Sequence, residues 1–333
     1  MARRPLALTM GEPGGVGPEI TLKAHEALRS SACVFFALAD PSVFPADRVA
    51  VVSAPGDAAA AFARRLPVLD IGRAAQGRAG RADPASAPAV IASIEYAVAL
   101  ALSGAASGVV TNPIEKSSLS AAGFGWPGHT EFIEHLTRGA PMPGARARGA
   151  VMMIAGPSLR TVPVTIHRSV RDAAAELTAE AIVRKAVITI EALRADFAIV
   201  APRLAISGLN PHAGEKGMMG REEIDVIAPA VAALRARYGA AVTGPRPADT
   251  LFHEEARARY DAALCMLHDQ ALIPAKTLSF HEAVNVTLGL PIVRTSPDHG
   301  TALDIAGKGA ARADSLITAI KLAATLADAR ART

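Results

Sequence analysis

Short apolar runs alternate with longer amphipathic segments along nearly the whole chain, and this alternation constrains the fold more than any other feature. Buried strands are predicted at residues 5–10, 32–40, 107–113, 149–156, 160–167, 203–211 and 262–269. Helices are predicted from about Pro18 and over residues 86–102, 178–194, 221–238 and 312–330. Strands that alternate with helices form a largely parallel sheet with helices on its faces. The sequence therefore predicts an α/β fold, and its 333 residues suggest about two domains.

The charge pattern argues against a nucleic-acid partner. The chain has 35 basic and 31 acidic residues, which leaves a net charge of +4. Its arginines are scattered, as at Arg3–Arg4 and Arg64–Arg65, without interleaved aromatic residues. A nucleic-acid footprint needs basic residues gathered on one surface. A small anionic substrate remains compatible with this pattern.

The sequence also predicts a cytoplasmic protein without a membrane span. The apolar stretch in "MARRPLALTM" is too short for a signal peptide. Residues 96–114 lack charge, but glycines, an asparagine and a proline interrupt them, so a helix followed by a strand explains them better than a membrane span. Cys33 and Cys265 lie in apolar runs and match no metal or redox spacing, which is typical of core residues in a reducing compartment.

Three histidines follow predicted strands directly or within a few residues: His167 after "TVPVTI", His212 after "LAISGLNP" and His268 after "AALCML". In open α/β sheets, ligands gather at the carboxyl ends of strands. Three imidazoles delivered to one place can hold a divalent ion and leave a coordination position open for substrate. The pattern alone leaves two interpretations open, a metal triad or ordinary polar residues at strand ends.

Two glycine-rich stretches precede predicted helices. In "GFGWPGHTEFIEHL", residues His129 and Thr130 stand where free backbone N–H groups can meet an anion, although Thr130 can equally be an ordinary helix cap. The loop "GEPGGVGPE", residues 11–19, lacks the strict G-x-G-x-x-G spacing of a dinucleotide loop. It is either a weak nucleotide signal or simply a tight strand–helix turn.

A dense polar stretch lies between His268 and the last helix. Lys276, Asn285 and Arg294 supply a point charge, an amide and a planar guanidinium, which suit a phosphate and a carboxylate. Each of the three taken alone is compatible with a solvated surface residue. Their occurrence together beside His268 favours a substrate site.

The chain resembles the 4-hydroxythreonine-4-phosphate dehydrogenase family of the vitamin B6 pathway. The resemblance covers nearly the whole length and runs through "GEPGGVGPE", "TNPIEKS", "GHTEF", "GLNPHAGE", "MGREEID", "PADTLF", "LHDQ" and "VNVTLGLPIVRTSPDHGTALDIAG". The segment "DHGTALDIAGKG" is also similar to the cofactor loop of isocitrate and isopropylmalate dehydrogenases. This likeness implies their two-domain α/β/α architecture, which is not a Rossmann fold, with the active cleft between the domains. Residues 1–128 and 262–333 would form the domain with the cofactor loop, and residues 129–261 a central domain with metal, substrate and dimer contacts.

The resemblance implies a role for each matching position. It assigns substrate binding to His129, Thr130, Lys276, Asn285 and Arg294. It assigns one divalent metal per subunit, Zn, Mg or Co, to His167, His212 and His268, with one ligand coming from the partner subunit of a homodimer. It assigns NAD or NADP to His299, Gly300, Thr301 and Asp304. The chain departs from the family at Gly15, where the family usually has Ala. The stretch "TIHRSV", which contains His167, also matches the family less closely than the other motifs, so His167 is the least secure of the three metal ligands.

The reaction implied is oxidation of 4-phosphooxy-L-threonine to 2-amino-3-oxo-4-phosphooxybutanoate, which decarboxylates to 3-amino-2-oxopropyl phosphate. A divalent ion lowers the pKa of the substrate hydroxyl and favours the anionic states of both steps. The proton acceptor is open among Asp249, Asp269 and Lys276. A sister dehydrogenase acting on phosphothreonate or an aromatic cis-dihydrodiol is the main alternative. A metal-dependent phosphatase or lyase and a non-catalytic binding protein are further alternatives, which the cofactor-like loop disfavours.

Overall fold

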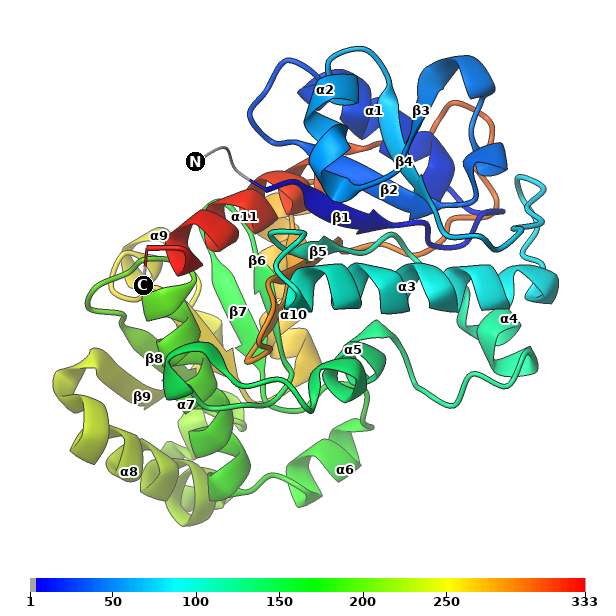
Figure 1. Cartoon of the computed structure of the whole chain (residues 1–333). Helices are drawn as coiled ribbons and strands as arrows, with labels where there is room; N and C mark the ends of the chain where they lie inside the picture. Colours follow the sequence, from blue (N-terminus) through cyan, green and yellow to red (C-terminus); the bar gives the residue numbers. More distant parts are fainter. Residues whose placement is uncertain (1–3, 333) are drawn as a thin grey trace. The chain divides into compact units, whose positions relative to one another are not determined.

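The computed structural model describes residues 4–332, which form two compact units. Unit 1 comprises the chain up to Pro141 together with Leu290–Ala331, and unit 2 comprises Met142–Gly289. Helices alternate with strands in both units (Figure 1), which confirms the predicted α/β class.

Unit 1 contains six strands in the order β3-β4-β2-β1-β5-β12, and every pairing among these six is parallel. Its strands are β1 (Leu6–Thr9), β2 (Phe35–Ala39), β3 (Val49–Val52), β4 (Leu66–Asp70), β5 (Val109–Val110) and β12 (Arg294–Pro297). Its helices are α1 (Gly17–Leu28), α2 (Ala58–Phe62), α3 (Ala87–Leu102), α4 (Lys116–Ala121), α5 (His129–Thr137) and α11 (Asp314–Arg330).

The central strands of unit 1 are buried along their whole length. β1 reads "LALT" and β2 reads "FFALA", and each of their residues is buried. A parallel strand covered on both faces needs such a continuous apolar run, because neither face meets water. Each large side chain buried there contributes about 1.5–3 kcal/mol. The strands of this unit therefore form from apolar runs rather than from an alternating pattern.

Helix α3 covers the sheet of unit 1 and packs against β1 and β2. Ser93 joins the two layers: its Oγ donates to Leu38 O at 2.6 Å and accepts from Met10 N at 2.9 Å. With its preceding turn, the stretch Pro84–Leu102 is long and apolar enough to cross a membrane by length and composition alone. Its buried residues face the sheet of unit 1, so α3 is a core helix.

Unit 2 contains six further strands in the order β11-β6-β7-β10-β8-β9. Strand β6 runs antiparallel to both of its neighbours, and the pairings from β7 to β9 are parallel. Its strands are β6 (Val151–Ala155), β7 (Arg160–Pro163), β8 (Leu204–Ser207), β9 (Val242–Arg246), β10 (Ala262–Cys265) and β11 (Val284–Leu288). Its α-helices are α6 (Val170–Ala175), α7 (Ala179–Ala195), α8 (Ala228–Tyr238), α9 (Glu254–Arg257) and α10 (His268–Ser279).

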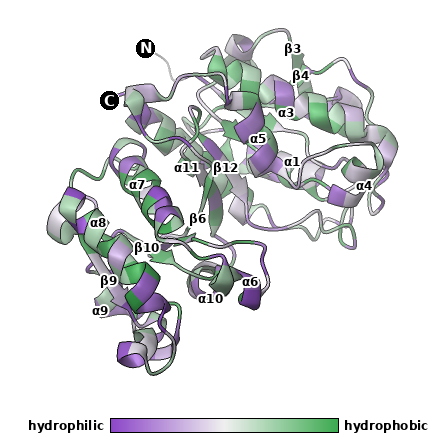
Figure 2. Ribbon diagram, turned by 90° about the horizontal axis from the view of Figure 1, so that it is seen from below, coloured by the Kyte–Doolittle hydropathy of each residue, from purple (hydrophilic) through white to green (hydrophobic). Residues whose placement is uncertain are grey.

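Three shorter helical segments of unit 2 matter for the site. They are η6 (Pro211–Gly217), the π-helical turn η7 (Glu223–Ile227) and η9 (Ala248–Thr250). Helix α7 carries apolar and polar residues on different sides, as the mixed colours of its ribbon show (Figure 2). Its buried residues face the strands, since α7 packs against β6 and β11.

The unit boundaries differ from the expected domain boundaries after residues 128 and 261. Residues 262–289 fall in unit 2, because β10 pairs with β7 and β8 and β11 pairs with β6. Helix α5, expected in the central domain, falls in unit 1, where it packs against α3. Local sequence patterns gave no sign of these three pairings, each of which joins strands more than 50 residues apart. Strands β3, β4, β9, β11 and β12 were not predicted.

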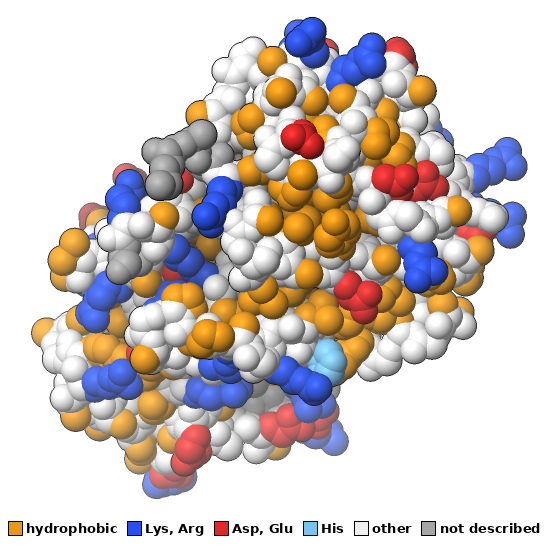
Figure 3. All heavy atoms as spheres, in the orientation of Figure 1, with side chains coloured by type: hydrophobic (Ala, Val, Ile, Leu, Met, Phe, Trp, Pro, Cys, Tyr) orange, Lys and Arg blue, Asp and Glu red, His pale blue; other side chains and the backbone are white. Residues whose placement is uncertain are grey.

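Basic and acidic side chains are interspersed over the face drawn in Figure 3. Residues 72–88 connect β4 to α3 and lie against other parts of unit 1. Arg78 and Arg81 form a small β-bridge, and Gly80 N donates to Gly14 O at 2.9 Å. The segment therefore packs on the glycine-rich loop of residues 11–17.

Candidate functional site

The first turn of α5 carries His129 and Thr130, the two residues predicted to hold an anion. The helix begins directly after Gly128, which has no side chain to cap it. The N–H groups of a first helical turn lack intrahelical partners and are available to a bound anion. Within the described part of the chain, His129 Nε2 is buried and has no hydrogen-bond partner. A buried ring nitrogen at a helix N-terminus fits a site that a ligand completes.

Two cations lie near this imidazole. Burial lowers the pKa of His129 well below its ordinary value, and the charges of Arg294 and Lys116 lower it further. The ring is therefore neutral near pH 7. Arg294 begins β12, is buried and donates from Nη2 to Thr111 Oγ1 at 2.7 Å. Burial lowers the pKa of Arg294 to about 10, so the guanidinium remains charged.

Lys116 completes this group from the start of α4. A Cβ atom at Gly128 would lie 3.8 Å from Lys116 Nζ, so the ammonium lies beside the N-terminus of α5. Guanidinium, ammonium and free backbone N–H groups together are suited to a phosphate. The structure thus brings His129, Thr130 and Arg294 together in unit 1, and it adds Lys116, to which the sequence analysis gave no role. Lys116 lies in the motif "TNPIEKS", one of the stretches that resemble the family, and that motif was the sequence feature that could have indicated its role.

The predicted cofactor loop lies between β12 and α11, also in unit 1. Thr301 is buried and donates from Oγ1 to Glu115 Oε2 at 3.0 Å, and its carbonyl accepts from Val16 N at 2.9 Å. His299, Gly300 and Asp304 are exposed. The contact with Val16 joins the glycine-rich loop of residues 11–17 to the predicted cofactor loop. The two stretches that the sequence linked to nucleotides therefore lie together.

Helix α1 anchors the far end of this loop. Lys23 Nζ donates to Gly309 O at 2.8 Å and to Ala311 O at 2.6 Å, and Glu19 Oε1 accepts from Lys23 Nζ and from Ala311 N. Nearby, the carboxyl of Glu12 is only 2% exposed, and burial raises its pKa. Sequence reasoning missed these residues because Glu and Lys in a helix or turn normally indicate a solvated surface.

Two of the three predicted metal ligands lie together in unit 2. β7 and β10 are parallel neighbours, and their pairing continues beyond the strands through Val164 N to Cys265 O at 2.7 Å and Thr165 N to Met266 O at 3.2 Å. His167 and His268 leave this shared edge, and their ring centres are 6.1 Å apart. The ends of these two strands thus bring His167 and His268 close together, and their role as metal ligands stays a prediction.

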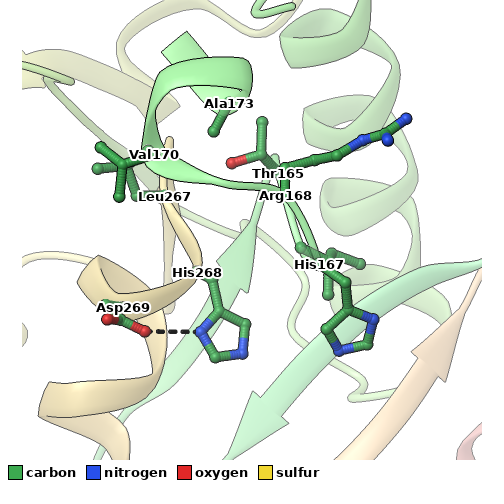
Figure 4. A pocket seen from close by; sticks show the side chains of 9 residues that line it. Thr165, His167, Arg168, Val170, Ala173, Leu267, His268 and Asp269 are labelled. Atoms are coloured by element: carbon green, nitrogen blue, oxygen red, sulfur yellow. Dashed lines mark hydrogen bonds and ion pairs between the residues drawn. The ribbon is translucent and has the colours of Figure 1, made fainter.

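The two rings line a pocket of about 180 Å³ with Asp269, Thr165 and Leu267 among its other lining residues. Figure 4 shows the two imidazoles side by side, with Arg168 directed away from them. The His268 Nδ1–H group donates to Asp269 Oδ1 at 2.7 Å. A carboxylate on one ring nitrogen fixes the tautomer and leaves the other nitrogen, Nε2, for a ligand. Asp269 was one of three candidate proton acceptors, and in the structure it contacts His268.

His212 lies outside this pocket, on the exposed turn η6. The backbone there is left-handed over five successive residues: His212 (φ 51°), Ala213 (52°), Gly214 (78°), Glu215 (41°) and Lys216 (57°). Each non-glycine residue in this conformation costs about 1–2 kcal/mol. Such strain persists where surrounding contacts determine the conformation, and it is common at functional sites. The glycines of "NPHAGEKG" indicated a sharp turn, but not that its other residues would share the left-handed conformation.

Within residues 4–332, no three histidine, cysteine, aspartate or glutamate side chains are grouped closely enough to hold a metal ion. The chain by itself therefore brings two of the expected ligands together and leaves His212 apart. Asp249 is exposed on η9, which packs against η6, the turn that carries His212.

The remaining predicted substrate residues also lie in unit 2. Lys276 is half-buried on α10, about two turns after His268. Asn285 lies on β11, and within the described residues its Oδ1 atom is buried without a hydrogen-bond partner. A buried amide oxygen of this kind is unfavourable unless a ligand or water satisfies it. Asn285 is therefore the better supported of the two as a ligand contact.

Comparisons with known proteins agree with these features. The family model described as pyridoxal phosphate biosynthetic protein PdxA matches residues 25–323. The 4-hydroxythreonine-4-phosphate dehydrogenase of Caulobacter vibrioides is 56% identical over 334 residues, covering 99% of both chains. The crystal structure of the enzyme of that name from Klebsiella pneumoniae superposes with a TM-score of 0.84 at 35% identity, covering 98% of both chains.

A more distant likeness concerns a different substrate. The crystal structure of a terephthalate 1,2-cis-dihydrodiol dehydrogenase from Burkholderia xenovorans has a TM-score of 0.64 at 28% identity, covering 97% of this chain and 98% of the other. The full-length family match and the higher identities decide the assignment. The chain belongs to the PdxA family of pyridoxal phosphate biosynthetic proteins.

Proposed function

We propose that the protein is an NAD(P)-dependent 4-hydroxythreonine-4-phosphate dehydrogenase of pyridoxal phosphate biosynthesis. It oxidises 4-phosphooxy-L-threonine to 2-amino-3-oxo-4-phosphooxybutanoate, which decarboxylates to 3-amino-2-oxopropyl phosphate. The observation that carries this proposal is the 56% identity, over the full length, to the Caulobacter vibrioides enzyme of that name. The arrangement of charged residues in each unit supports it independently.

The phosphate of the substrate binds at the N-terminus of α5. Arg294 presents a charged guanidinium already removed from water, so a phosphate meets it without first displacing a hydration shell. His129 is neutral, because burial and the two neighbouring cations lower its pKa, and it contributes a hydrogen bond rather than a charge. Thr130 and the backbone N–H groups of the first turn complete the set. Lys276 and Asn285, which lie in unit 2, keep the substrate-binding role that the family resemblance implies.

The pocket at His167 and His268 fits a divalent metal ion. With Zn–N distances of about 2.0–2.1 Å, a tetrahedral zinc site places the ring centres of two imidazole ligands about 5 Å apart, which is about 1 Å less than the 6.1 Å between these rings. Asp269 orients His268 so that Nε2 is the ligating atom. A divalent ion bound there supplies the Lewis acid that makes the substrate hydroxyl easier to deprotonate.

The third ligand requires a second copy of the chain. His212 does not line the pocket of its own chain, and the two residues directly after η6, Met218 and Met219, are 83% and 45% exposed. Exposed apolar residues beside a polar functional residue are typical of a surface that a partner covers. We therefore propose a homodimer in which each metal site takes ligands from both subunits. Both cysteines are free, as is usual in a reducing compartment, and a cytoplasmic location is part of the proposal.

The cofactor and the proton acceptor complete the assignment. His299, Gly300, Thr301 and Asp304 would hold NAD or NADP, which would supply the hydride acceptor when bound. Because Asp269 is hydrogen-bonded to His268, it acts as a positioning residue. The role of proton acceptor then falls to Lys276 or Asp249.

The test is formation of reduced nicotinamide from 4-phosphooxy-L-threonine after metal removal and after re-addition of Zn²⁺, Mg²⁺ or Co²⁺. Phosphothreonate and an aromatic cis-dihydrodiol are compared in parallel, since the likeness to the Burkholderia xenovorans enzyme makes a diol dehydrogenase the second candidate. The cationic group at α5 favours the phosphorylated substrates. Turnover of the diol alone would overturn the proposal. Product without reduced nicotinamide would indicate a phosphatase or lyase, and binding without turnover a binding protein.

His212→Ala tests the metal assignment directly. We expect this variant to lose metal-dependent turnover while it stays folded, because η6 is exposed. Near-normal activity of the variant in metal-free buffer would remove the metal from the mechanism.

A further inference from the structure

The left-handed turn that carries His212 is built around one buried carboxylate, that of Glu223. Its side chain is only 4% exposed, although it follows two charged residues in "GREE". Glu223 Oε1 accepts from Leu209 N at 2.8 Å and from Asn210 N at 2.7 Å, and Oε2 accepts from Asn210 Nδ2 at 2.9 Å. Both oxygens are therefore used to hold the two residues that lead into the turn.

The turn also closes tightly around this carboxylate. A Cβ atom at Gly214 would lie 2.6 Å from Glu223 Oε2, and one at Gly208 would lie 3.1 Å from Oε1. Gly214 also has a φ of +78°, which strongly favours glycine. The backbone on both sides of His212 is thus shaped to fit the carboxylate. Because Ala213 N donates to Asn210 O, holding Asn210 also holds the residue after His212.

We propose that Glu223 is a positioning residue for His212. It fixes the strained backbone so that the imidazole is presented in one orientation to the metal, and it does not touch the metal or substrate itself. Its oxygens already accept three hydrogen bonds inside the turn, which leaves it unsuited to be a ligand or a base. This inference rests on the proposed role of His212 as a metal ligand.

The neighbouring Glu222 provides a matched control. It has the same side chain, lies in the same turn of the chain and accepts from Asn210 Nδ2 at 2.7 Å. The backbone N–H groups of Leu209 and Asn210, however, donate to Glu223 and not to Glu222. It is also more exposed. If any loss of negative charge near Asn210 were sufficient, Glu222→Gln and Glu223→Gln would behave alike.

The experiment measures the affinity of the full-length protein for Zn²⁺ by competition with a chromogenic chelator. Residues that orient metal ligands typically change metal affinity about 10–100-fold when removed, and we expect a loss of this size for Glu223→Ala. Glu223→Gln keeps one acceptor oxygen and should lose less. Glu222→Gln should stay within about fivefold of the wild type. Circular dichroism and the unfolding midpoint establish that each variant is folded.

A double-mutant cycle with His212→Ala separates positioning from general loosening of the fold. If Glu223 acts through His212, adding Glu223→Ala to His212→Ala causes no further loss of Zn²⁺ affinity. Additive losses, or wild-type affinity in both Glu223→Ala and Glu223→Gln, would overturn the inference. If Glu223→Ala does not fold, the Glu223→Gln cycle gives the same answer. Wild-type affinity in His212→Ala alone would instead contradict the proposed function, so the two failures are distinguishable.

Discussion

Replacement of Arg294 by methionine should stabilise the protein and abolish phosphate recognition. Arg294 is buried at the start of β12, where its charge has lost most of its contact with water. A charge kept in such a place is unfavourable for folding unless a ligand compensates for it. Methionine has a similar length, and its flexible thioether fills the same space without a charge. Stability and function are therefore expected to change in opposite directions.

The size of the effect follows from the pKa. Burial lowers the pKa of Arg294 from 12.5 to about 10. The guanidinium is charged near pH 7 in both the folded and the unfolded protein, so a lower folded pKa means that the charge destabilises the fold. At about 1.4 kcal/mol per pKa unit, the penalty is about 3 kcal/mol. Loss of the charged hydrogen bond to Thr111 Oγ1 offsets about 1.5–3 kcal/mol of this, which leaves a net gain of about 1 kcal/mol or less.

The assay has two parts. Chemical denaturation compares the free energy of unfolding of wild type and Arg294→Met, with and without inorganic phosphate. A ligand at 100 times its Kd stabilises the folded state by about 2.7 kcal/mol, and we expect this gain in the wild type only. Steady-state kinetics should show KM for 4-phosphooxy-L-threonine raised about 10–100-fold, because hydrogen bonds to charged groups contribute about 1.5–3 kcal/mol.

Arg294→Lys serves as the control, since it keeps the charge and loses the planar fork. It should keep part of the response to phosphate and gain little stability. A variant Arg294→Met that is less stable than the wild type by 1 kcal/mol or more, or that phosphate still stabilises fully, would refute the reasoning.

Three further predictions concern other parts of the chain. His25 is 5% exposed and donates to Phe62 O at 2.7 Å, and burial lowers its pKa. Because the unfolded chain then binds a proton more readily than the folded protein, wild-type stability should fall as the pH drops below about 6.5. Denaturation at two pH values should show a smaller fall in His25→Gln. Lys216→Gly should raise the free energy of unfolding by about 1 kcal/mol by relieving the left-handed backbone, whereas an equal gain in Lys216→Ala would argue against strain as the cause. Thr301→Val removes the hydrogen bond from Thr301 Oγ1 to Glu115, and it should raise KM for the nicotinamide cofactor about fivefold while Zn²⁺ affinity stays unchanged. A variant that changes only the metal affinity would contradict the assignment of this loop to the cofactor.

The sequence by itself determined the class of fold and most of the elements around the site. Strands such as β1 and β2 are continuous apolar runs, and helices such as α3 and α7 have long apolar faces, so local periodicity was sufficient to find them. The same local reading placed histidines at strand ends. Hydrophobic period and turn residues are properties of neighbouring positions, which is why a single sequence carries them.

Only the tertiary structure decided which of these residues meet. His167 and His268 lie together because β7 and β10 are parallel neighbours, a pairing between segments about 100 residues apart. The same pairing moves residues 262–289 into unit 2, contrary to the expected boundary. Strand order depends on long-range packing, which local patterns do not encode. His212 lies apart from the pair for the same reason, and the expectation that a partner subunit joins them stays a prediction.

The sequence also did not determine which charged side chains are buried. Glu223 and Arg294 are charged residues that a local pattern assigns to solvent, yet both are nearly inaccessible. A buried charge is stable only where a specific set of hydrogen bonds or a ligand surrounds it, and that set comes from segments distant in the chain, as Thr111 is from Arg294. The sequence supplied the chemical groups, whereas the fold determined which of them water cannot reach.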